Sequence, residues 1–415
     1  MRVLVLTQWY QPEPGLLMQE LAQTLQAHGH EVTVLTGFPN YPSGEIYPGY
    51  RVRAWQKETI ASVPVVRVAL YPEHSRSAVK RVANYLSFAC SCAVLAPFLV
   101  RRPDVLFVYH PPLTVGIPAI WLSLLWRVPF VYQIQDMWPE TLRATGMVKN
   151  PRALAWVGRF ARGVYARARA LIVISPGFRQ NLLEKGVAPE KIHVISNWVD
   201  QAVYRPEERD PGLSDALKLT GRFNVMFAGN MGEAQGLETV LEAAALLRDL
   251  DDVQFVLVGG GIAVPRLQEI VRERELTNVR FLGRFPIQQM PGLYALADAL
   301  LIHLKDDPLF RITIPHKTFA YMASGKPVLA AMAGDAADIV SGAEAGLTCP
   351  PENAGALADT VRRLRGLSDA ERRRMAQNGL DTIRDAYSRD LLAGQIEGLL
   401  KAITAVGPHA GRERT

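Results

Sequence analysis

The chain has 415 residues, of which 49% are hydrophobic and 21% are charged, with a net charge of +6. This composition is typical of a globular protein with a large core, roughly two or three domains long, and it excludes a disordered or collagen-like chain. Three cysteines, Cys90, Cys92 and Cys349, provide neither a disulfide framework nor a CxxC pair, which favours a reducing cytoplasm.

The charge is unevenly distributed along the chain. Residues 1–200 contain 21 Lys or Arg and 12 Asp or Glu, whereas residues 201–415 contain 25 and 28. A basic N-terminal half predicts contact with an anionic surface. Because the sequence has no nucleic-acid motif with interleaved aromatics, we predict a membrane surface and no nucleic acid. The chain enters an apolar strand at once, without a signal-peptide pattern, so we expect a cytoplasmic protein.

The first predicted elements form a βαβ unit. Val3–Thr7 is an apolar run typical of a buried parallel strand, a helical stripe follows from Leu16 to Gly29, and residues 31–36 form the next strand. The loop between them, which ends at Gly15, is expected at the carboxyl edge of the sheet, where open α/β sheets bind ligands. The loop lacks the GxGxxG fingerprint, so it does not predict a dinucleotide site.

Residues 36–51 are rich in Pro, Gly and Tyr and predict a long loop. Its tyrosines would either stack on sugar rings or sit at a lipid interface; the alternative is a structural loop packed on its domain.

Two apolar helices are predicted at residues 78–102 and 113–126. Cations flank them: Lys80, Arg81, Arg101, Arg102 and Arg127. The apolar part of the first helix is about 15 residues, too short for a span of about 20. We expect most of the apolar surface to be buried and its rim to touch a membrane interface; the alternative is that both are ordinary buried helices.

Buried strands are predicted at residues 104–109 and 129–133, and Asp136 and Glu140 follow the second, where a cleft is expected. A basic helix at 152–169 and strands at 170–174 and 192–195 follow. The polar, Pro-rich residues 196–212 then predict a domain boundary.

The second half repeats this alternation, which predicts a second doubly wound domain. Strands are expected at 224–228, 253–258, 279–282 and 299–304, with Gly-rich turns at 229–236 and 259–261. The stretch Asp306–Pro327 then predicts a loop and a helix that begins near His316, with Arg311 and Lys317 at its N-terminus. A helix N-terminus with two cations suits a diphosphate, although an ordinary strand–helix connection carrying exposed basic residues is the alternative.

Helices are predicted at 353–366, 370–386 and 389–404. We therefore predict a first domain at 1–198, a second at 199–386, a C-terminal helix at 387–404 that packs back on the first domain, and a flexible tail at 405–415.

Several segments together resemble glycosyltransferase family 4. They are GHEVTVLTGFPNYPSG, NYLSF, QDMWPE, SNWVD, AGNMGEAQG and IPHKTFAYMASGKPVL. The resemblance extends to about residue 405, and it is strongest to the bacterial branch that builds O-antigen, capsule and colanic acid, including transferases of N-acetyl-L-fucosamine. It implies an α/β protein of the GT-B fold, with two doubly wound Rossmann-like domains facing across a cleft.

The sequence departs from the family pattern at several positions. Many members carry a Glu-x7-Glu pair around the donor sugar and ribose, and the corresponding residues here are Ile312 and Ala320. Asn230 and Gln235 replace the usual basic pair of the Gly-rich turn, and Gln135 replaces a frequent histidine.

The resemblance implies a retaining transfer from a UDP-sugar, for which an N-acetylated amino or deoxyamino sugar is expected, to a polyprenyl-diphosphate-linked saccharide. Catalysis is assigned to Lys317 and Arg311, with the backbone of 314–317, which stabilise the departing diphosphate, and to Asp136. Glu140, Gly15 and Leu16 would line the acceptor side. The donor-binding residues are expected to be Gly229, Asn230, Gln235, Gly236, Gly260, Arg284, Phe285, Ile314, Pro315 and His316.

The resemblance implies a protein on the inner face of the bacterial cytoplasmic membrane, with no cofactor. We predict no metal, because the sequence has no suitably placed DxD motif and the adjacent Asp306 and Asp307 are poorly placed to chelate together. Two alternatives remain: a nucleotide-sugar epimerase of the GT-B fold, which would need no lipid acceptor, and a non-catalytic sugar-nucleotide-binding subunit, which the missing carboxylates favour.

Overall fold

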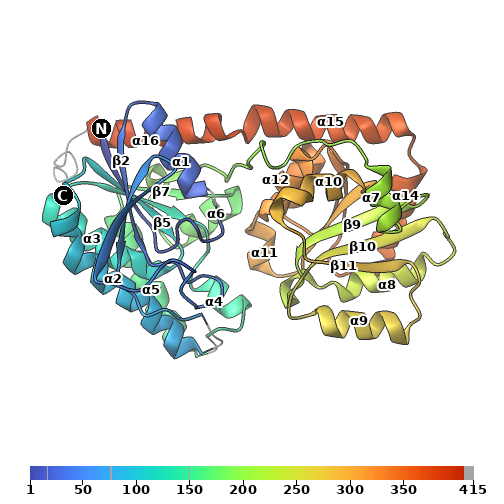
Figure 1. Ribbon diagram of the computed structural model, residues 1–415, viewed down its shortest axis with the longest axis horizontal. Coiled ribbons are helices and arrows are strands. Elements are labelled where there is room, and N and C mark those ends of the chain that lie inside the picture. Colours follow the sequence, from blue (N-terminus) through green and yellow to red (C-terminus); the bar gives the residue numbers. More distant parts are fainter. Residues whose placement is uncertain (16, 75–76, 149, 406–415) are drawn as a thin grey trace. The chain divides into compact units, whose positions relative to one another are not determined.

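The computed structural model describes residues 1–15, 17–74, 77–148 and 150–405 and divides the chain into two compact units (Figure 1). The first unit is Met1–Ser196 together with the residues from Asp390 onward, and the second is Asn197–Arg389. The structure therefore changes unit two residues before the predicted boundary at 198. Leu16 and the predicted tail from residue 406 onward lie outside the described residues.

The first unit contains an eight-stranded sheet in the order β3-β4-β2-β1-β5-β6-β7-β8. The strands are β1 (Arg2–Leu6), β2 (Glu31–Gly37), β3 (Trp55–Ile60), β4 (Val63–Val68), β5 (Val105–His110), β6 (Phe130–Ile134), β7 (Ala170–Val173) and β8 (Ile192–Val194). Neighbouring strands are parallel except β3 and β4. The central strands are almost wholly buried, as expected for a parallel sheet covered on both faces.

The β3–β4 hairpin is not predictable from the local sequence pattern. Its two turn residues, Ala61 and Ser62, both have positive φ, at 45° and 69°. Such a turn usually carries Asn-Gly or Asp-Gly, so the residues at these positions give no hairpin signal.

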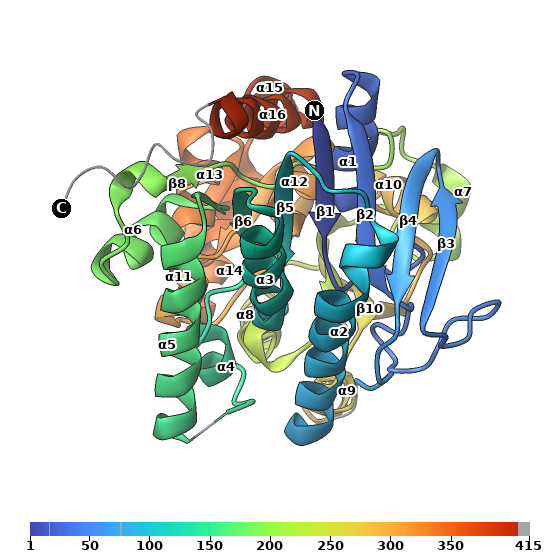
Figure 2. The ribbon, with the colours of Figure 1, turned by 90° about the vertical axis from the view of Figure 1, so that its left-hand side faces the viewer.

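Helices cover both faces of this sheet. They are α1 (Leu17–Ala27), α2 (Ala78–Leu99), α3 (Gly116–Trp126), α4 (Glu140–Ala144), α5 (Pro151–Arg167), α6 (Pro176–Glu184) and α16 (Arg389–Ala405), with short 3₁₀ turns at Leu113–Val115 and Pro189–Lys191. In the sheet, β2 and β4 lie on one side of β1, whereas β5, β6 and β7 follow one another on its other side. Because crossovers between parallel strands are right-handed, α2, α3 and α5 lie side by side on one face, where Figure 2 shows them.

The amino edge of the first sheet holds α16. Glu397, which is 8% exposed, accepts from His28 at 2.6 Å and from His30 at 2.8 Å, and Lys401 lies 2.5 Å from the same carboxylate. These contacts hold the pKa of Glu397 at about 2, with Lys401 as the largest cause. A buried carboxylate with three basic partners thus attaches the C-terminal helix to the first unit.

Helix α2 ends at Leu99, three residues before the end of the predicted helix at 78–102, but more of it is apolar than the predicted 15 residues. Its 22 residues are long and apolar enough to cross a membrane by length and composition, the one such helix among the described residues. The prediction that it is too short to span is therefore wrong. Six of its residues are buried in the unit, and a core helix passes the same test, so the length is weak support for a span.

The second unit contains a six-stranded parallel sheet in the order β11-β10-β9-β12-β13-β14. The strands are β9 (Phe223–Asn230), β10 (Val253–Gly260), β11 (Val279–Gly283), β12 (Ala299–His303), β13 (Val328–Ala331) and β14 (Gly346–Cys349). The order reverses between β9 and β12, which creates a topological switch point at their carboxyl ends. Separate apolar clusters, one containing Met226 and Leu300 and the other Phe227 and Leu301, pack on the two faces.

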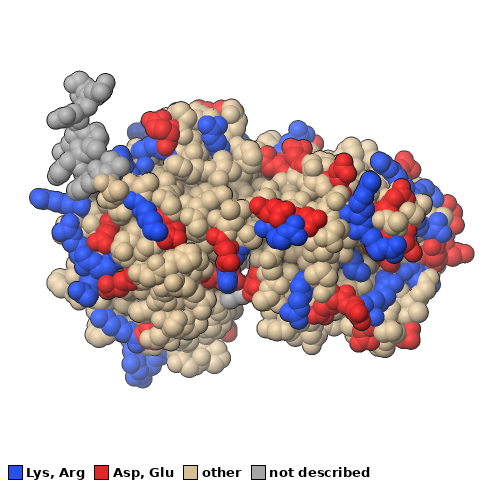
Figure 3. Space-filling view, turned by 90° about the horizontal axis from the view of Figure 1, so that it is seen from above, with Lys and Arg blue, Asp and Glu red and all other residues tan. Residues whose placement is uncertain are grey.

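The helices of the second unit connect these strands. They are α7 (Pro211–Ala216), α8 (Glu238–Leu246), α9 (Val264–Glu273), α10 (Met290–Ala295), α11 (Pro308–Ile312), α12 (His316–Ala323), α13 (Asp335–Gly342), α14 (Ala354–Gly366) and α15 (Asp369–Ala386), with 3₁₀ turns at Glu233–Gln235 and Ile287–Gln289. Basic and acidic side chains are interspersed over the part of this unit that Figure 3 shows.

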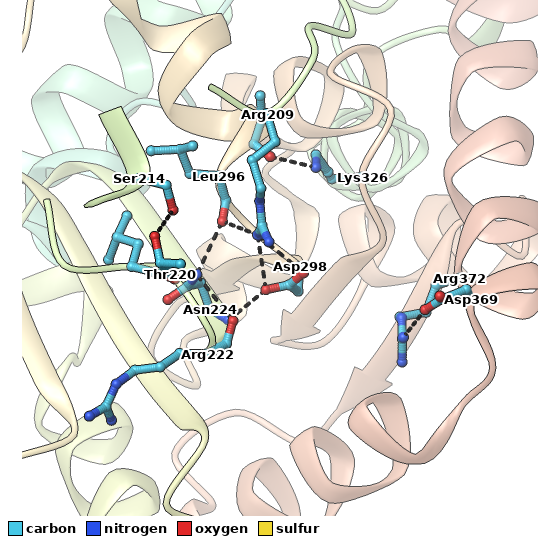
Figure 4. A network of polar contacts seen from close by, with 12 residues as sticks. Arg209, Ser214, Thr220, Arg222, Asn224, Leu296, Asp298, Lys326, Asp369 and Arg372 are labelled. Carbon is cyan, nitrogen blue, oxygen red and sulfur yellow. Dashed lines mark hydrogen bonds and ion pairs between the residues drawn. The ribbon is translucent and has the colours of Figure 1, made fainter. Parts of the chain in front are cut away.

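The amino edge of the second sheet is closed by a polar network (Figure 4). Asp298 accepts from the backbone N–H of Asn224 at 2.8 Å and from Arg209 at 3.2 Å, and Arg209 also donates to the carbonyl of Leu296 at 2.5 Å. This network fixes the segment before α7 to the starts of β9 and β12.

Candidate active site

A pocket of about 460 Å³ lies at the switch point of the second unit. The carboxyl ends of β9 and β10, the loop after β11, and helices α10 and α12 surround it. The lining residues are Tyr204, Ala228, Gly229, Asn230, Val258, Gly259, Gly260, Arg284, Phe285, Met290, Tyr294, His316, Lys317 and Ala320. Its volume is within the range of small-molecule sites, about 300–1,000 Å³.

Glycines allow the two strands to approach each other at this pocket. Gly259 pairs with Gly229 across β9 and β10, and a β-carbon at Gly259 would lie 2.0 Å from the carbonyl oxygen of Gly229. A β-carbon at Gly260 would lie 2.6 Å from Nε of Arg284. Glycine is thus required for the strand approach and for the position of this guanidinium.

Lys317 is the unusual group in the pocket. Its Nζ atom is buried without a hydrogen-bond partner and lies 3.7 Å from the ring centroid of Phe227. A β-carbon at Gly229 would lie 3.3 Å from that nitrogen, so the amine points at the Gly-rich turn. Burial lowers the pKa of Lys317 to about 7. A buried cation without an anionic partner is costly, and an anionic ligand would remove this cost.

The second cation at the pocket is Arg284 and not Arg311. Arg284 is exposed, lines the pocket and has no ion-pair partner among the described residues. Arg311 lies on α11, where its guanidinium makes two hydrogen bonds of 2.8 and 2.9 Å to Asp306 at the surface. The expected pairing of Arg311 with Lys317 in the pocket is therefore not found: the five-residue separation of Asp306 and Arg311 around a short helix lets them pair locally instead.

Aromatic side chains form one wall of the pocket. The rings of Tyr204 and Tyr294 are stacked with centroids 6.3 Å apart, and His316 meets Tyr204 edge-on at 5.8 Å. Tyr321 packs edge-on against Tyr294, with ring centroids 5.4 Å apart. The hydroxyl of Tyr321 accepts from the backbone N–H of Ala228 and donates to its C=O, which holds the ring in this position. Tyr204 and Tyr294 were not predicted as pocket residues, because one lies near the domain boundary and the other within an apolar helix, where the sequence pattern does not indicate a binding site.

Four predicted donor-binding residues have structural roles and do not line the pocket. Gln235 accepts from the backbone of Gly232 at 2.9 Å, and Gly236 packs against His303. Ile314 is buried in the core, and Pro315 is the N-cap residue of α12. The remaining predicted donor residues, from Gly229 to His316, do line it.

The carboxyl edge of the first unit is organised by a buried carboxylate. Glu13 is 1% exposed and accepts from the backbone N–H groups of Tyr10, Asn40 and Tyr41 at 2.8–3.0 Å. Burial raises the pKa of Glu13 to about 7, although these hydrogen bonds and Arg67 oppose the shift. Glu13 was not among the predicted site residues. Its bonds to Asn40 and Tyr41 hold the first part of the long loop at residues 36–51 in place.

Asp136 lies at the same edge of the first unit. Burial raises its pKa to about 6, and its charge contributes to the raised pKa values of Tyr41 and Tyr109. Trp9 stacks on Tyr41 with centroids 4.6 Å apart, which gives this edge an aromatic surface of the kind that binds sugar faces. Asp136 is therefore a half-buried carboxyl group close enough to Tyr41 and Tyr109 to raise their pKa values.

His110 is a further buried group near this edge. It is 1% exposed, and neither ring nitrogen has a hydrogen-bond partner among the described residues. Its ring lies 5.7 Å from that of Trp138 and 5.8 Å from that of Tyr132, and burial lowers its pKa to about 3. His110 is thus neutral at physiological pH.

The other predicted residues of the first unit lie at two different places. Gly15 accepts a hydrogen bond from Gln11 at 3.3 Å in the exposed loop after β1. Glu140 begins α4 and lies 2.7 Å from Lys185 of the segment after α6. Leu16 lies outside the described residues. No cluster of three or more His, Cys, Asp or Glu side chains that could hold a metal is found within the described part of the chain.

Solved structures share this architecture. Sucrose-phosphate synthase from Thermosynechococcus elongatus superposes with a TM-score of 0.74 at 18% identity, over 98% of this chain and 100% of that one. HepE of Anabaena, solved in complex with UDP, superposes with a TM-score of 0.72 at 18% identity, over 97% of this chain and 100% of that one. These similarities show that the chain has the GT-B fold.

Relatives identified by sequence identify the family as well as the fold. WcaI of Escherichia coli K12, named for glycosyl transfer in colanic acid biosynthesis, is 30% identical over 317 residues, which are 73% of this chain and 76% of WcaI. WbjE of Pseudomonas aeruginosa, named as a glycosyltransferase, is 27% identical over 63% of this chain and 66% of its own length. Residues 14–198 match the glycosyl transferase 4-like domain, and residues 222–366 match the glycosyl transferases group 1. The chain therefore belongs to glycosyltransferase family 4, within the branch that contains transferases of bacterial surface polysaccharides.

Proposed function

We propose that this glycosyltransferase moves a sugar from a UDP-sugar, with retention of configuration, to a lipid-linked saccharide in the synthesis of a bacterial surface polysaccharide. The observation that carries the donor part is the buried, unpartnered Nζ of Lys317 in the pocket of the second unit. The UDP and UDP-glucose complexes of HepE support a uridine nucleotide as the donor carrier.

In this proposal Lys317 and Arg284 stabilise the departing diphosphate. The ammonium of Lys317 regains its charge as the diphosphate approaches, because a nearby anion raises the pKa of an amine. The free N–H groups at the start of α12 add positive potential beside it. Cations placed before the reaction where negative charge develops stabilise a transition state, and the buried Nζ of Lys317 is such a group.

The acceptor hydroxyl attacks on the face from which UDP leaves, and the leaving phosphate takes its proton. This route needs no enzyme nucleophile. Asp136, with its pKa near 6, accepts a hydrogen bond from a sugar hydroxyl and helps to orient it.

The donor sugar is proposed to be an N-acetylated amino or deoxyamino sugar. Ala320, which lines the pocket and is 3% exposed, stands where many family members have a glutamate. A methyl side chain removes an acceptor for hydroxyl groups and suits a deoxy carbon or an acetamido methyl group.

A membrane surface is proposed for the first unit. One stripe of α2 is apolar and exposed, at the helical spacing of three or four residues: Val79, Val82, Leu86, Val94 and Phe98. Trp121, Leu124 and Leu125 of the adjacent α3 extend it. The exposed apolar surface is larger than predicted, since only the rim of these helices was expected to be exposed. The exposed cations Lys80, Arg101 and Arg102 flank it. Apolar side chains between cations suit the interface of an anionic bilayer.

Arg81 departs from the predicted membrane role. Its Nη2 atom donates to the hydroxyl of Tyr85 at 3.4 Å, and its Nε atom is buried. Arg81 therefore belongs to the carboxyl edge of the first unit, near Tyr41 and His74.

The experiment that tests the proposed function incubates the protein with a panel of UDP-sugars, with and without lipid-linked saccharide extracted from bacterial membranes. Sugar transfer to the lipid fraction is expected, and the Lys317→Ala variant should lose it. Interconversion of UDP-sugars without an acceptor would instead identify an epimerase. UDP-sugar binding without any turnover would identify a non-catalytic subunit.

A further inference from the structure

A second pocket, of about 340 Å³, lies within the first unit between the start of α4, one face of α5 and the residue Lys185 after α6. Trp138, Pro139 and Glu140 bring the chain to it directly after the carboxyl end of β6. Figure 2 shows α4 beside α5. The pocket is thus close in the chain to Asp136, the proposed contact of the acceptor.

The polar groups inside this pocket are incompletely paired. Glu140 and Lys185 lie 2.7 Å apart and neutralise each other's charge, but Oε2 of Glu140 has no hydrogen-bond partner. The hydroxyl of Tyr165, a residue only 1% exposed, also has none. Buried polar atoms without partners are rare in folded proteins, so this pocket offers one hydroxyl donor and one carboxylate acceptor to a ligand.

Two arginines give the pocket a net positive charge. Arg159 and Arg162 lie on the face of α5 that lines it, and neither has an acidic partner among the described residues. Arg159 lies over the ring of Trp156 at 5.7 Å, which helps to hold its orientation. Because the Glu140–Lys185 pair is neutral, the two guanidinium groups favour an anion with several oxygens, and arginine binds phosphate oxygens in a bidentate manner.

Helix packing keeps these groups around an open space. Gly158 faces Pro139, and a β-carbon there would lie 3.6 Å from the proline ring, so α5 and the start of α4 are in contact on one side of the pocket. Trp156, which is 72% exposed, lies one turn before Arg159 on α5. An apolar chain that left the pocket along this part of α5 would therefore meet an exposed indole ring.

We propose that this pocket binds the phosphate-linked end of the acceptor: the diphosphate contacts Arg159 and Arg162, and a hydroxyl of the attached sugar contacts Glu140 and Tyr165. This inference rests on the proposed function and adds to it a binding site for the acceptor. The pocket lies in the unit that does not hold the donor pocket, so acceptor and donor nucleotide have separate sets of cations.

The test uses two soluble probes, inorganic diphosphate and farnesyl diphosphate, and measures their binding to the full-length protein by calorimetry and by quenching of tryptophan fluorescence. Saturating UDP is present throughout, so that the donor pocket of the second unit is filled and does not bind the probes. Both probes are expected to bind. Tighter binding of farnesyl diphosphate would identify a lipid-linked ligand, whereas equal binding would identify a site for phosphate alone and would overturn the lipid assignment.

The test variant is Arg159→Gln/Arg162→Gln, and the matched control is Arg152→Gln/Arg167→Gln. The control removes the same charge from the two ends of the same helix, at exposed positions that do not line the pocket. We expect the test variant to weaken diphosphate binding by about tenfold or more, as loss of charged hydrogen bonds does. The control should bind as the wild type does, and both should bind UDP normally, which verifies folding.

Two results would overturn the inference: no binding of either probe to the wild type, or equal binding to the test variant and the control. A further variant, Tyr165→Phe, keeps the ring and removes only the hydroxyl, and should raise the KM for lipid-linked acceptor without changing the KM for UDP-sugar. If the wild type binds diphosphate through these arginines but transfers no sugar, the proposed function fails and the anion site stands.

Discussion

The substitution Lys317→Met tests the donor site through two opposite effects. Burial lowers the pKa of this amine from 10.5 to about 7, which corresponds to roughly 4–5 kcal/mol of unfavourable free energy for its charged form. Part of the side chain is exposed, so a smaller effect is expected in practice. Methionine fills similar space without the charge. We therefore expect the free energy of unfolding of the second unit to increase by about 1–3 kcal/mol, while turnover falls by about 100- to 1,000-fold.

The pH dependence of stability provides an independent measurement. Between about pH 7 and the ordinary pKa of a lysine near 10.4, Lys317 is neutral in the folded protein and charged in the unfolded chain. The unfolded state then binds more protons, so stability should rise with pH across this window. Thermal unfolding from pH 7 to pH 10 should show this rise in the wild type and a smaller rise in Lys317→Met.

Lys326→Met is the matched control. Its amine lies at the amino edge of the same unit (Figure 4), donates to the carbonyl of Ala295 at 2.8 Å, and has a pKa that burial lowers as well. The control therefore removes a second buried amine, at the edge opposite the pocket, and should leave turnover unchanged. If Lys317→Met kept turnover within a few-fold of the wild type, or if Lys326→Met lost turnover to the same extent, the assignment of Lys317 to a diphosphate would be refuted.

Four further results are expected. Arg284→Ala should weaken UDP binding by about tenfold, whereas Arg311→Ala should change it little because Arg311 pairs with Asp306; calorimetry with UDP separates the two. Transferase activity should survive EDTA, and abolition by EDTA with rescue by Mg²⁺ would contradict this. Glu397→Gln should lower the melting temperature at pH 7 but not near pH 2, because a carboxyl whose pKa is lowered to about 2 stabilises the fold above its unfolded pKa and loses that contribution as pH falls. Arg101→Gln/Arg102→Gln should reduce co-sedimentation with anionic liposomes at low salt and leave UDP binding intact; equal binding of the wild type to neutral and anionic liposomes would exclude electrostatic docking.

The sequence predicted the features that depend on local pattern. Continuous apolar runs gave the central strands of both sheets, and the alternation of strands with helices gave two doubly wound units. The helix that begins at His316 was expected at the carboxyl edge of a sheet, and this position brings Lys317, its second residue, to the lining of the pocket. The β3–β4 hairpin and its unusual Ala61–Ser62 turn followed no such pattern.

The choice between Arg284 and Arg311 could not be made from spacing along the chain. Arg311 is closer to Lys317 in sequence, but α11 directs its guanidinium to Asp306. Arg284 is 33 positions before Lys317 and reaches the pocket because Gly260 of the neighbouring strand has no side chain to block it. The absence of a side chain at Gly260 therefore leaves room for Arg284 at the pocket. Predicting this contact requires the register between β10 and β11, which the spacing of residues along the chain does not provide.

Lys317 differs from the other buried polar groups of the second unit because it is an unpaired amine. Amide oxygens without a partner also occur at the amino edge of this unit, at Asn224 and Asn278, whereas the ionisable Asp298 of that edge is paired with Arg209. An uncharged amide oxygen costs less to bury than a group that must carry a charge, and an unpaired buried polar group already costs about 1–3 kcal/mol. The cost of the buried amine is one that an anion can offset, which is the physical reason to seek the donor diphosphate at the carboxyl edge of the second unit.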